Sequence, residues 1–144
     1  MGKFFKTTIL NISRNQEPVV ALTVRNAETP EEKHKGLRGE TNIGDGMYFS
    51  FNSPRLLQFE MKGMKRPIDM LFMKHNVVQK ILKNLQPGQQ VPVETADAVL
   101  EVPAGLTDRY AIREGDMVKQ AQYNMLIHLK LVRKDYYGDC LNNG

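Results

Sequence analysis

Short segments of β-branched or alternating apolar residues, each ended by a turn signal, constrain the fold of this chain more than any other feature. The segment 19–24 reads VVALTV, and the polar stretch 15–18 before it ends in proline. A three-residue hairpin loop is predicted between 68–73 and 77–82. The predicted strands cover residues 7–13, 19–24, 47–51, 57–61, 68–73, 77–82, 98–102, a stretch starting at 117, and 125–132, with a break at 52–54.

A chain with this many short strands must protect their edges, because an exposed strand edge pairs with other chains. It can do so by closing its sheet or by stacking two sheets. We therefore predict a mainly β (α+β) fold. The expected architecture is a compact β-barrel-like or sandwich domain with one short helix, in the N-terminal half, packed on the sheet.

The clearest local signal belongs to that helix. Thr29 is a good N-cap, Pro30 suits the first helical position, and Glu32 can complete a capping box with the threonine. We expect the helix to cover residues 30–37 and to stop near Gly39. A further single helical turn is predicted at 106–110.

Length and composition limit the possible classes of protein. The 144 residues, 41% hydrophobic and 25% charged, predict one globular domain over 1–144. No apolar run reaches the ~18 residues of a membrane span, and none follows the N-terminus as a secretion signal would. We expect a cytoplasmic protein, or a virion protein if a phage encodes it. The single cysteine, Cys140, excludes an internal disulfide and a cysteine zinc site, so neither metal nor cofactor is predicted.

Lys62 and Asp69 are the first candidates for chemistry. A lysine among apolar residues near a carboxylate can bind a polar ligand or transfer protons. The alternative is that the two residues have a purely structural role. Met61 and Met47 are added as candidate contacts of a ligand. Four methionines between 61 and 73 can bind a soft metal or fill a core, and alternation along a strand favours the core.

Two further surfaces are candidates for binding macromolecules. Arg55, Lys62, Lys65 and Arg66 surround Phe59, a combination that can bind single-stranded nucleic acid, but a net charge of +4 is mild for that function. The apolar segment 125–132 can pair with 7–13 or with a partner chain. Its candidate partner-binding residues, with two tyrosines after it, are Leu126, Ile127, Leu129, Leu131, Tyr136 and Tyr137.

Several motifs in a fixed order carry a resemblance to a known family. The sequence TPEE starts the predicted helix and GLRGE follows it, FEMKGM leads to PIDMLF, and VLEVPAG is followed by GDMV. Over residues 20–119 the chain resembles the family named domain of unknown function 192 (DUF192). The resemblance implies a compact, mainly β fold without an established activity. Glu60 stands where the family has tryptophan, Gly63 and Met64 where it has Asn-Thr, and 120–144 is an extension beyond the family domain.

The leading functional hypothesis is a non-enzymatic module for binding or assembly, conceivably a phage or virion structural component that docks through its terminal extensions. We expect a protein partner or a homo-oligomer. No nucleophile elbow or phosphate-binding loop is present to indicate an enzyme. The alternatives are a small-ligand-binding protein or enzyme that uses Lys62 and Asp69, and a nucleic-acid-binding domain.

Overall fold

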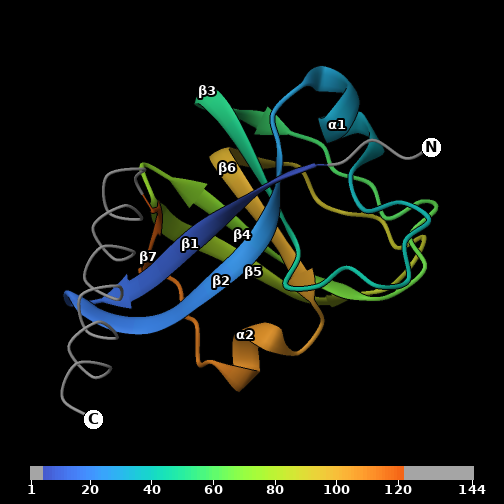
Figure 1. The fold of residues 1–144 in the computed structure, drawn as a ribbon. Helices are drawn as coiled ribbons and strands as arrows, with labels where there is room; N and C mark the ends of the chain where they lie inside the picture. Colours follow the sequence, from blue (N-terminus) through green and yellow to red (C-terminus); the bar gives the residue numbers. More distant parts are fainter. Residues whose placement is uncertain (1–4, 122–144) are drawn as a thin grey trace, which may run out of the picture.

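The computed structural model describes residues 5–121, which contain seven strands and two short helices (Figure 1). In chain order the elements are β1 (Lys6–Arg14), β2 (Glu17–Ala27), α1 (Pro30–Lys35), β3 (Met47–Leu57), β4 (Ile68–Lys74), β5 (Val77–Leu85), β6 (Glu94–Pro103), α2 (Leu106–Arg109) and β7 (Met117–Gln120). No helix within these residues has the length and apolar character needed to cross a membrane.

The strands form one mixed sheet that closes in a ring in the order β1-β2-β3-β6-β4-β5-β7. The pairing of β2 with β3 is parallel and the other pairings are antiparallel. The ring is not a regular barrel, because β5 and β7 join only at Val77 and Met117. The predicted mainly β fold is thus confirmed, with the edges protected by closure of the sheet.

Two apolar clusters lie on the two faces of this sheet. The inner cluster takes side chains from all seven strands and fills the ring, with α2 closing one end (Figure 1). The outer cluster lies on the opposite face of β3, β4 and β6, under α1 and the loops 36–46, 58–67 and 86–93. Alternation along β6 divides its residues between the two: Val99 belongs to the outer cluster, and Leu100 belongs to the inner one.

Helix α1 begins as its sequence predicts. Thr29 Oγ1 accepts a hydrogen bond from the Glu32 amide at 3.1 Å, and Glu32 Oε1 accepts one from the Thr29 amide at 2.9 Å. The helix ends at Lys35, two residues earlier than predicted, because Gly36 adopts φ +51° and caps it. Leu37 then turns into the outer cluster.

Three predictions about the strands and their connections are wrong. Strand β3 does not break at 52–54 but continues to Leu57, because its pairing with β6 shifts register between Ser50 and Arg55 and so tolerates a proline. The separate strand predicted at 57–61 does not form: Leu57 ends β3, and a loop crosses the outer cluster at 58–61. The β4–β5 hairpin has a two-residue loop, since His75 and Asn76 both adopt positive φ, as the tightest hairpin turns require.

The first strand is paired on both sides within the described residues. Residues 10–13 of β1 pair with β7, and all of β1 pairs with β2. Arg14 at its end forms a two-bonded ion pair with Asp116, with nitrogen–oxygen distances of 2.7 and 2.8 Å. Burial alone would raise the pKa of Asp116, but the hydrogen bonds from Arg14 and from the Arg113 amide hold it below its usual value.

Candidate ligand-binding site

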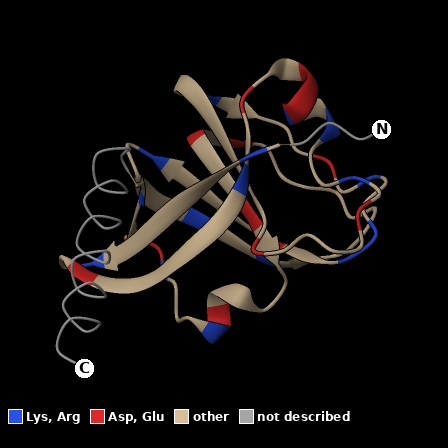
Figure 2. Ribbon diagram, in the orientation of Figure 1, with Lys and Arg blue, Asp and Glu red and all other residues tan. Residues whose placement is uncertain are grey.

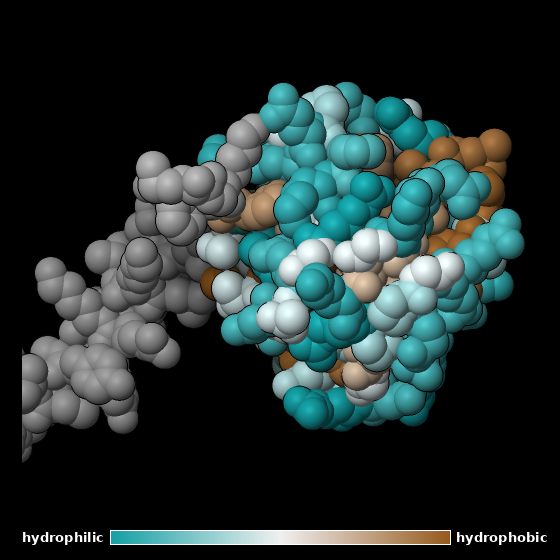
Figure 3. All heavy atoms as spheres, turned by 90° about the vertical axis from the view of Figure 1, so that its right-hand side faces the viewer, coloured by the Kyte–Doolittle hydropathy of each residue, from teal (hydrophilic) through white to brown (hydrophobic). Residues whose placement is uncertain are grey.

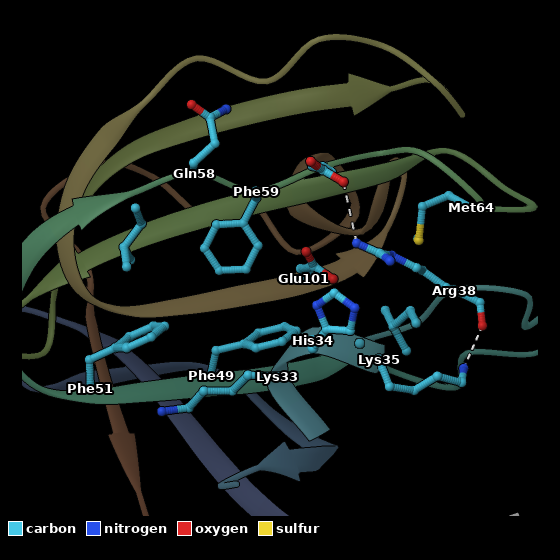
Figure 4. A pocket seen from close by; sticks show the side chains of 14 residues that line it. Lys33, His34, Lys35, Arg38, Phe49, Phe51, Gln58, Phe59, Met64 and Glu101 are labelled. Atoms are coloured by element: carbon cyan, nitrogen blue, oxygen red, sulfur yellow. Dashed lines mark hydrogen bonds and ion pairs between the residues drawn. The ribbon is translucent and has the colours of Figure 1, made fainter. Parts of the chain in front are cut away.

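A pocket of about 340 Å³ opens between α1 and the loop after β3, on the outer face of the sheet (Figure 4). This volume lies within the range of roughly 300–1,000 Å³ that is usual for small-molecule sites. One wall comes from α1 and the turn that follows it, another from β3 and residues 57–60, and the base from β6. The lining residues that concern function are Lys33, His34, Lys35, Arg38, Phe49, Phe51, Phe59, Glu60, Met64 and Glu101.

Three phenylalanines make the pocket largely aromatic. Phe49 and Phe51 point to the same side of β3, and Phe59 lies across from them on the loop (Figure 4). The Phe59 ring meets Phe49 edge to face, with centroids 5.3 Å apart, and Phe72 in the same manner at 6.2 Å. Such packed rings form a preorganised apolar wall that loses little entropy when a ligand binds.

Glu101 is the main polar group at the base of the pocket. It lies on β6, directly opposite Met47 of β3 and Met70 of β4. Only 4% of the residue is exposed, and its carboxyl points between Phe59, His34 and Arg38 (Figure 4). Within the described part of the chain this carboxyl has no hydrogen-bond or ion-pair partner. Burial raises its pKa from 4.5 to about 8.

The backbone at Glu101 is held tightly by β3. A Cβ atom on Gly46 would lie 1.8 Å from the Glu101 carbonyl oxygen, so the two strands approach here as only glycine permits. Gly46 also adopts φ +119°, which side-chain-bearing residues rarely do. The position of the carboxyl therefore depends on a close contact between β3 and β6.

The rim of the pocket is rich in charge, but its charged groups interact with one another. The Lys35 ammonium donates to the Arg38 carbonyl, and Arg38 Nη2 donates to Glu60 at 3.4 Å (Figure 4). The Lys33 ammonium lies over the Phe51 ring, 4.2 Å from its centroid. Burial lowers the pKa of Lys33, and the charge of Arg55 lowers it further.

Charges of both signs are interspersed on this side of the molecule. Figure 2 shows basic and acidic segments alternating along α1 and the loops beside it. Seen from that side, the surface is mostly hydrophilic, with apolar surface gathered at one edge (Figure 3). Leu56 and Val93 are two of the large apolar residues that remain exposed in the described chain.

The carboxyl at the base of the pocket can exchange a proton, but the lining offers no hydroxyl or thiol nucleophile. A protonated Glu101 can donate one hydrogen bond, and an ionised Glu101 can accept several or pair with a cation. The lining residues of the described chain include no serine, threonine, tyrosine or cysteine. Residues 5–121 contain no group of three or more histidine, cysteine, aspartate or glutamate side chains placed to hold a metal.

The structure does not bring the predicted pair Lys62 and Asp69 together. Lys62 is exposed on the loop, and no hydrogen bond or ion pair joins it to Asp69. Asp69 is 1% exposed and accepts hydrogen bonds from the Asn84 amide at 2.9 Å and from Thr107 Oγ1 at 2.6 Å, besides the amides of Gly105 and Thr107. Asp69 thus ties β4 to β5 and to the start of α2, which is the structural role we had considered as the alternative.

Met47 and Met61, the other predicted ligand contacts, are fully buried in the outer cluster and do not line the pocket. Met64 does line it. Met70 also belongs to the outer cluster, whereas Met73 belongs to the inner one, so the four clustered methionines do not share one face. Alternation along β4 separates them, as expected.

The aromatic ring of the predicted basic patch, Phe59, lines the outer pocket, whereas the four basic residues of the patch do not. Phe59 is packed against Phe49 and Phe72. Arg55 lies over Phe51, 5.5 Å from the ring centroid. The candidate partner-binding residues in 126–137 lie outside the described residues, and so does Cys140.

Glu101 was missed by the sequence interpretation, although a signal was available. It is the one charged residue in the predicted strand 98–102. Its side chain falls on the same face as that of Val99, two residues before it, and Val99 is buried. A charge on the buried face of a strand indicates either a structural ion pair or a site.

Comparison with known proteins identifies the family of this chain. The family model of DUF192, described as "Uncharacterized ACR", matches residues 10–120. The chain belongs to the DUF192 family. The match begins ten residues before the predicted start of the family domain, so it includes part of β1. No curated protein matches this chain.

Two solved structures share the DUF192 fold seen here. One is a candidate transcription regulator from Sinorhizobium meliloti, with 24% identity, a TM-score of 0.73, and coverage of 83% of this chain and 98% of the other. The second is a protein of unknown function from Novosphingobium aromaticivorans, with 29% identity, a TM-score of 0.68, and coverage of 80% and 86%. These similarities describe a fold and assign no activity to this chain.

Proposed function

We propose that this DUF192 chain is a small-molecule-binding domain and that its site is the outer pocket, with Glu101 at the base. The observation that carries the proposal is the buried Glu101 carboxyl, which has no partner among the described residues and is directed into a pocket lined by three phenylalanines. Its oxygens are not sealed in the core, since the fully buried side-chain atoms without a partner in the described residues are Asn26 Oδ1 and Arg66 Nε, but a largely buried carboxyl without a partner still calls for an explanation. A ligand that pairs with the carboxyl supplies one.

A comparison with Asp69 in the same chain strengthens the argument. Both carboxyl groups are more than nine-tenths buried. Asp69 receives four hydrogen bonds from three residues, which is how a structural carboxylate is normally satisfied. Glu101 receives none within the described residues and reaches a cavity instead. The fold therefore satisfies one buried acid and leaves the other available to a ligand.

A nucleic-acid function has weaker support. The relative from S. meliloti is described as a candidate transcription regulator, but at 24% identity the similarity concerns the fold. Among the described basic residues, Arg25 pairs with Glu40 and Arg38 pairs with Glu60, so part of the positive charge is neutralised.

The proposal is tested by nuclear magnetic resonance with the full chain and three small aromatic probes: phenethylamine, phenethyl alcohol and hydrocinnamate. We expect at least one probe to cause saturable amide shifts that cluster at the pocket residues, around Phe49, Phe59 and Glu101. Phe59→Ala should weaken the binding of that probe by about fivefold or more, because it removes an aromatic wall of the pocket. Tyr110→Ala, which removes an aromatic ring outside the pocket from a residue that is 38% exposed, is the matched control.

Two results would overturn the proposal. One is the absence of saturable shifts with all three probes up to millimolar concentration. The other is a set of shifts that maps away from the pocket and responds equally to the Phe59 and Tyr110 variants.

A further inference from the structure

We infer that the ligand of this pocket is an organic amine with an apolar, preferably aromatic, body, and that its ammonium group pairs with the Glu101 carboxylate. The inference rests on the proposed function and names the class of ligand. It follows from three features of the described residues: the missing partner of Glu101, the walls around its carboxyl, and the way the rim cations are already engaged.

Within residues 5–121 no cation pairs with Glu101. Lys35 is held by the Arg38 carbonyl, the Arg38 guanidinium by Glu60, and the Lys33 ammonium by the face of Phe51. None of them forms an ion pair with Glu101. A buried carboxylate is stable only when it is paired or hydrogen-bonded. A ligand ammonium would be its missing partner.

The walls around the carboxyl suit a cation with an apolar body. Aromatic faces attract cations, and the position of Lys33 over Phe51 shows that a ring of this pocket already holds an ammonium group at 4.2 Å. Phe51 and Phe59, which are both partly exposed in the pocket, offer apolar surface for the rest of the ligand. The thioether of Met64, also in the lining, is polarisable and adapts to different shapes.

The basic rim opposes entry of a cation, but weakly. The titratable groups that face the pocket are Lys33, His34 and Lys35 on α1, Arg38 after it, and Glu60 on the loop. Across the strands Glu101 faces Met47 and Met70, which do not titrate. His34, Lys35 and Glu60 are exposed, so water and salt screen their charges, whereas an ion pair at the buried Glu101 is screened much less.

Binding of an amine has a defined proton balance. In the empty pocket at neutral pH the Glu101 carboxyl is mostly protonated, because burial raises its pKa to about 8. When an ammonium ion binds, the carboxyl releases one proton to the solvent and the carboxylate accepts a hydrogen bond from the ligand nitrogen. The affinity for an amine should therefore rise by up to about tenfold per pH unit below pH 8, while the affinity for a neutral probe stays constant.

Calorimetric titration of the full chain tests the inference with probes that share a phenyl ring and differ in the head group. We expect phenethylamine to bind about tenfold more tightly than phenethyl alcohol at pH 8, which is what a charge-assisted pair adds. Hydrocinnamate should bind more weakly than the alcohol. Titrations of phenethylamine at pH 7 in two buffers of different ionisation enthalpy should show the release of close to one proton.

The Glu101→Gln variant keeps the shape of the side chain and should abolish the preference for the amine over the alcohol, together with the release of the proton. Glu114→Gln is the control, since Glu114 is an exposed carboxylate outside the pocket. It should leave both features in place.

The outcomes separate this inference from the proposed function. If the alcohol or hydrocinnamate binds in the pocket as well as phenethylamine or better, the site exists but the ligand class is wrong. A preference for the amine that is kept in Glu101→Gln also overturns the inference. If no probe binds, both the inference and the proposed function fail.

Discussion

The Asp69 carboxylate shows how one side chain can hold several elements together. It accepts hydrogen bonds from Asn84 after the bend in β5 and from Gly105 and Thr107 at the start of α2. A donor left without an acceptor in a buried position costs about 1–3 kcal/mol. Asp69 is therefore expected to make a large contribution to the stability of the fold for a single residue.

We predict that Asp69→Ala lowers the free energy of unfolding by about 3 kcal/mol, since it removes the acceptor of four hydrogen bonds at once. Chemical denaturation measures this change. Asp108→Ala is the control, because Asp108 is an exposed residue of α2. Its ion pair with Lys83 should contribute less than about 1 kcal/mol. Equal effects of the two substitutions would contradict the structural role of Asp69.

Glu101, by contrast, makes the stability of the protein depend on pH. Its pKa is about 8 in the folded chain and near 4.5 when exposed, so the folded state binds more protons between these values. The stability of the folded state must then fall as the pH rises from about 4.5 to about 8. Below this window Glu101 is protonated in both states and costs the least stability. Above it the buried carboxylate is ionised and costs the most.

We predict that Glu101→Gln is more stable than the parent chain at pH 8 and loses that advantage as the pH falls to 5. The difference between the two proteins should change by up to about 1.4 kcal/mol per pH unit within the window. Denaturation curves of both proteins at three pH values test this, and the other titrating groups cancel in the difference. A difference that stays constant with pH would show that Glu101 is ionised in the folded chain.

At the scale of elements, the contact between β3 and β6 sets the geometry of the pocket. Gly46 at the start of β3 lies against the backbone of Glu101, and the pairs Met47–Glu101 and Phe49–Val99 follow from it. Phe49 is thereby placed on the same face as the carboxyl. The pocket depends on this register, because a shift of β3 by one residue would move Phe49 to the inner face while Glu101 stayed on the outer one.

We predict that Gly46→Ala destabilises the protein by about 3 kcal/mol or more. The added carbon would lie 1.8 Å from the Glu101 carbonyl oxygen, which forces the strands apart. Gly44→Ala serves as the control for backbone strain alone: its φ is also positive, at +56°, but nothing lies within 4 Å of its added carbon. It should cost about 1 kcal/mol, and a similar loss in both variants would exclude the steric explanation.

At the scale of the whole molecule, the ring of strands is complete within residues 5–121. The last described pairing is between β7 and β1, and the Ala121 amide donates to the Ile9 carbonyl at 2.8 Å. A cut after Ala121 therefore keeps every described strand pair. The predicted role of the extension in assembly can then be separated from the folding of the ring.

We predict that the full chain forms a defined oligomer, and that a chain ending at Ala121 is a folded monomer. The predicted strand 125–132 with the tyrosines after it is the reason, since an apolar strand favours pairing with another chain. Light scattering gives both masses, and circular dichroism checks that the shortened chain is folded. Monomers in both cases would contradict assembly through the extension.

Much of the local structure was predictable, because it depends on neighbours in the sequence. Thr29 and Glu32 form the predicted capping box, and strands occur in the places that alternation and β-branching indicated. The strand predicted at 57–61 was wrong because Phe59 and Met61 alternate with polar residues in a loop that buries them against the sheet. Alternation of apolar and polar residues indicates only that every second side chain is buried. A loop that covers a sheet can bury such side chains just as a strand does.

The sequence by itself determined the β-rich class, the start of α1 and membership in the DUF192 family, since each rests on the order of nearby residues. Only the tertiary structure decided which acid is satisfied and which faces a cavity. The donors to Asp69 and the walls around Glu101 come from segments far apart in the chain. Closure of the ring brings them together, and neither the spacing nor the type of these residues specifies which segment will cover which face of the sheet.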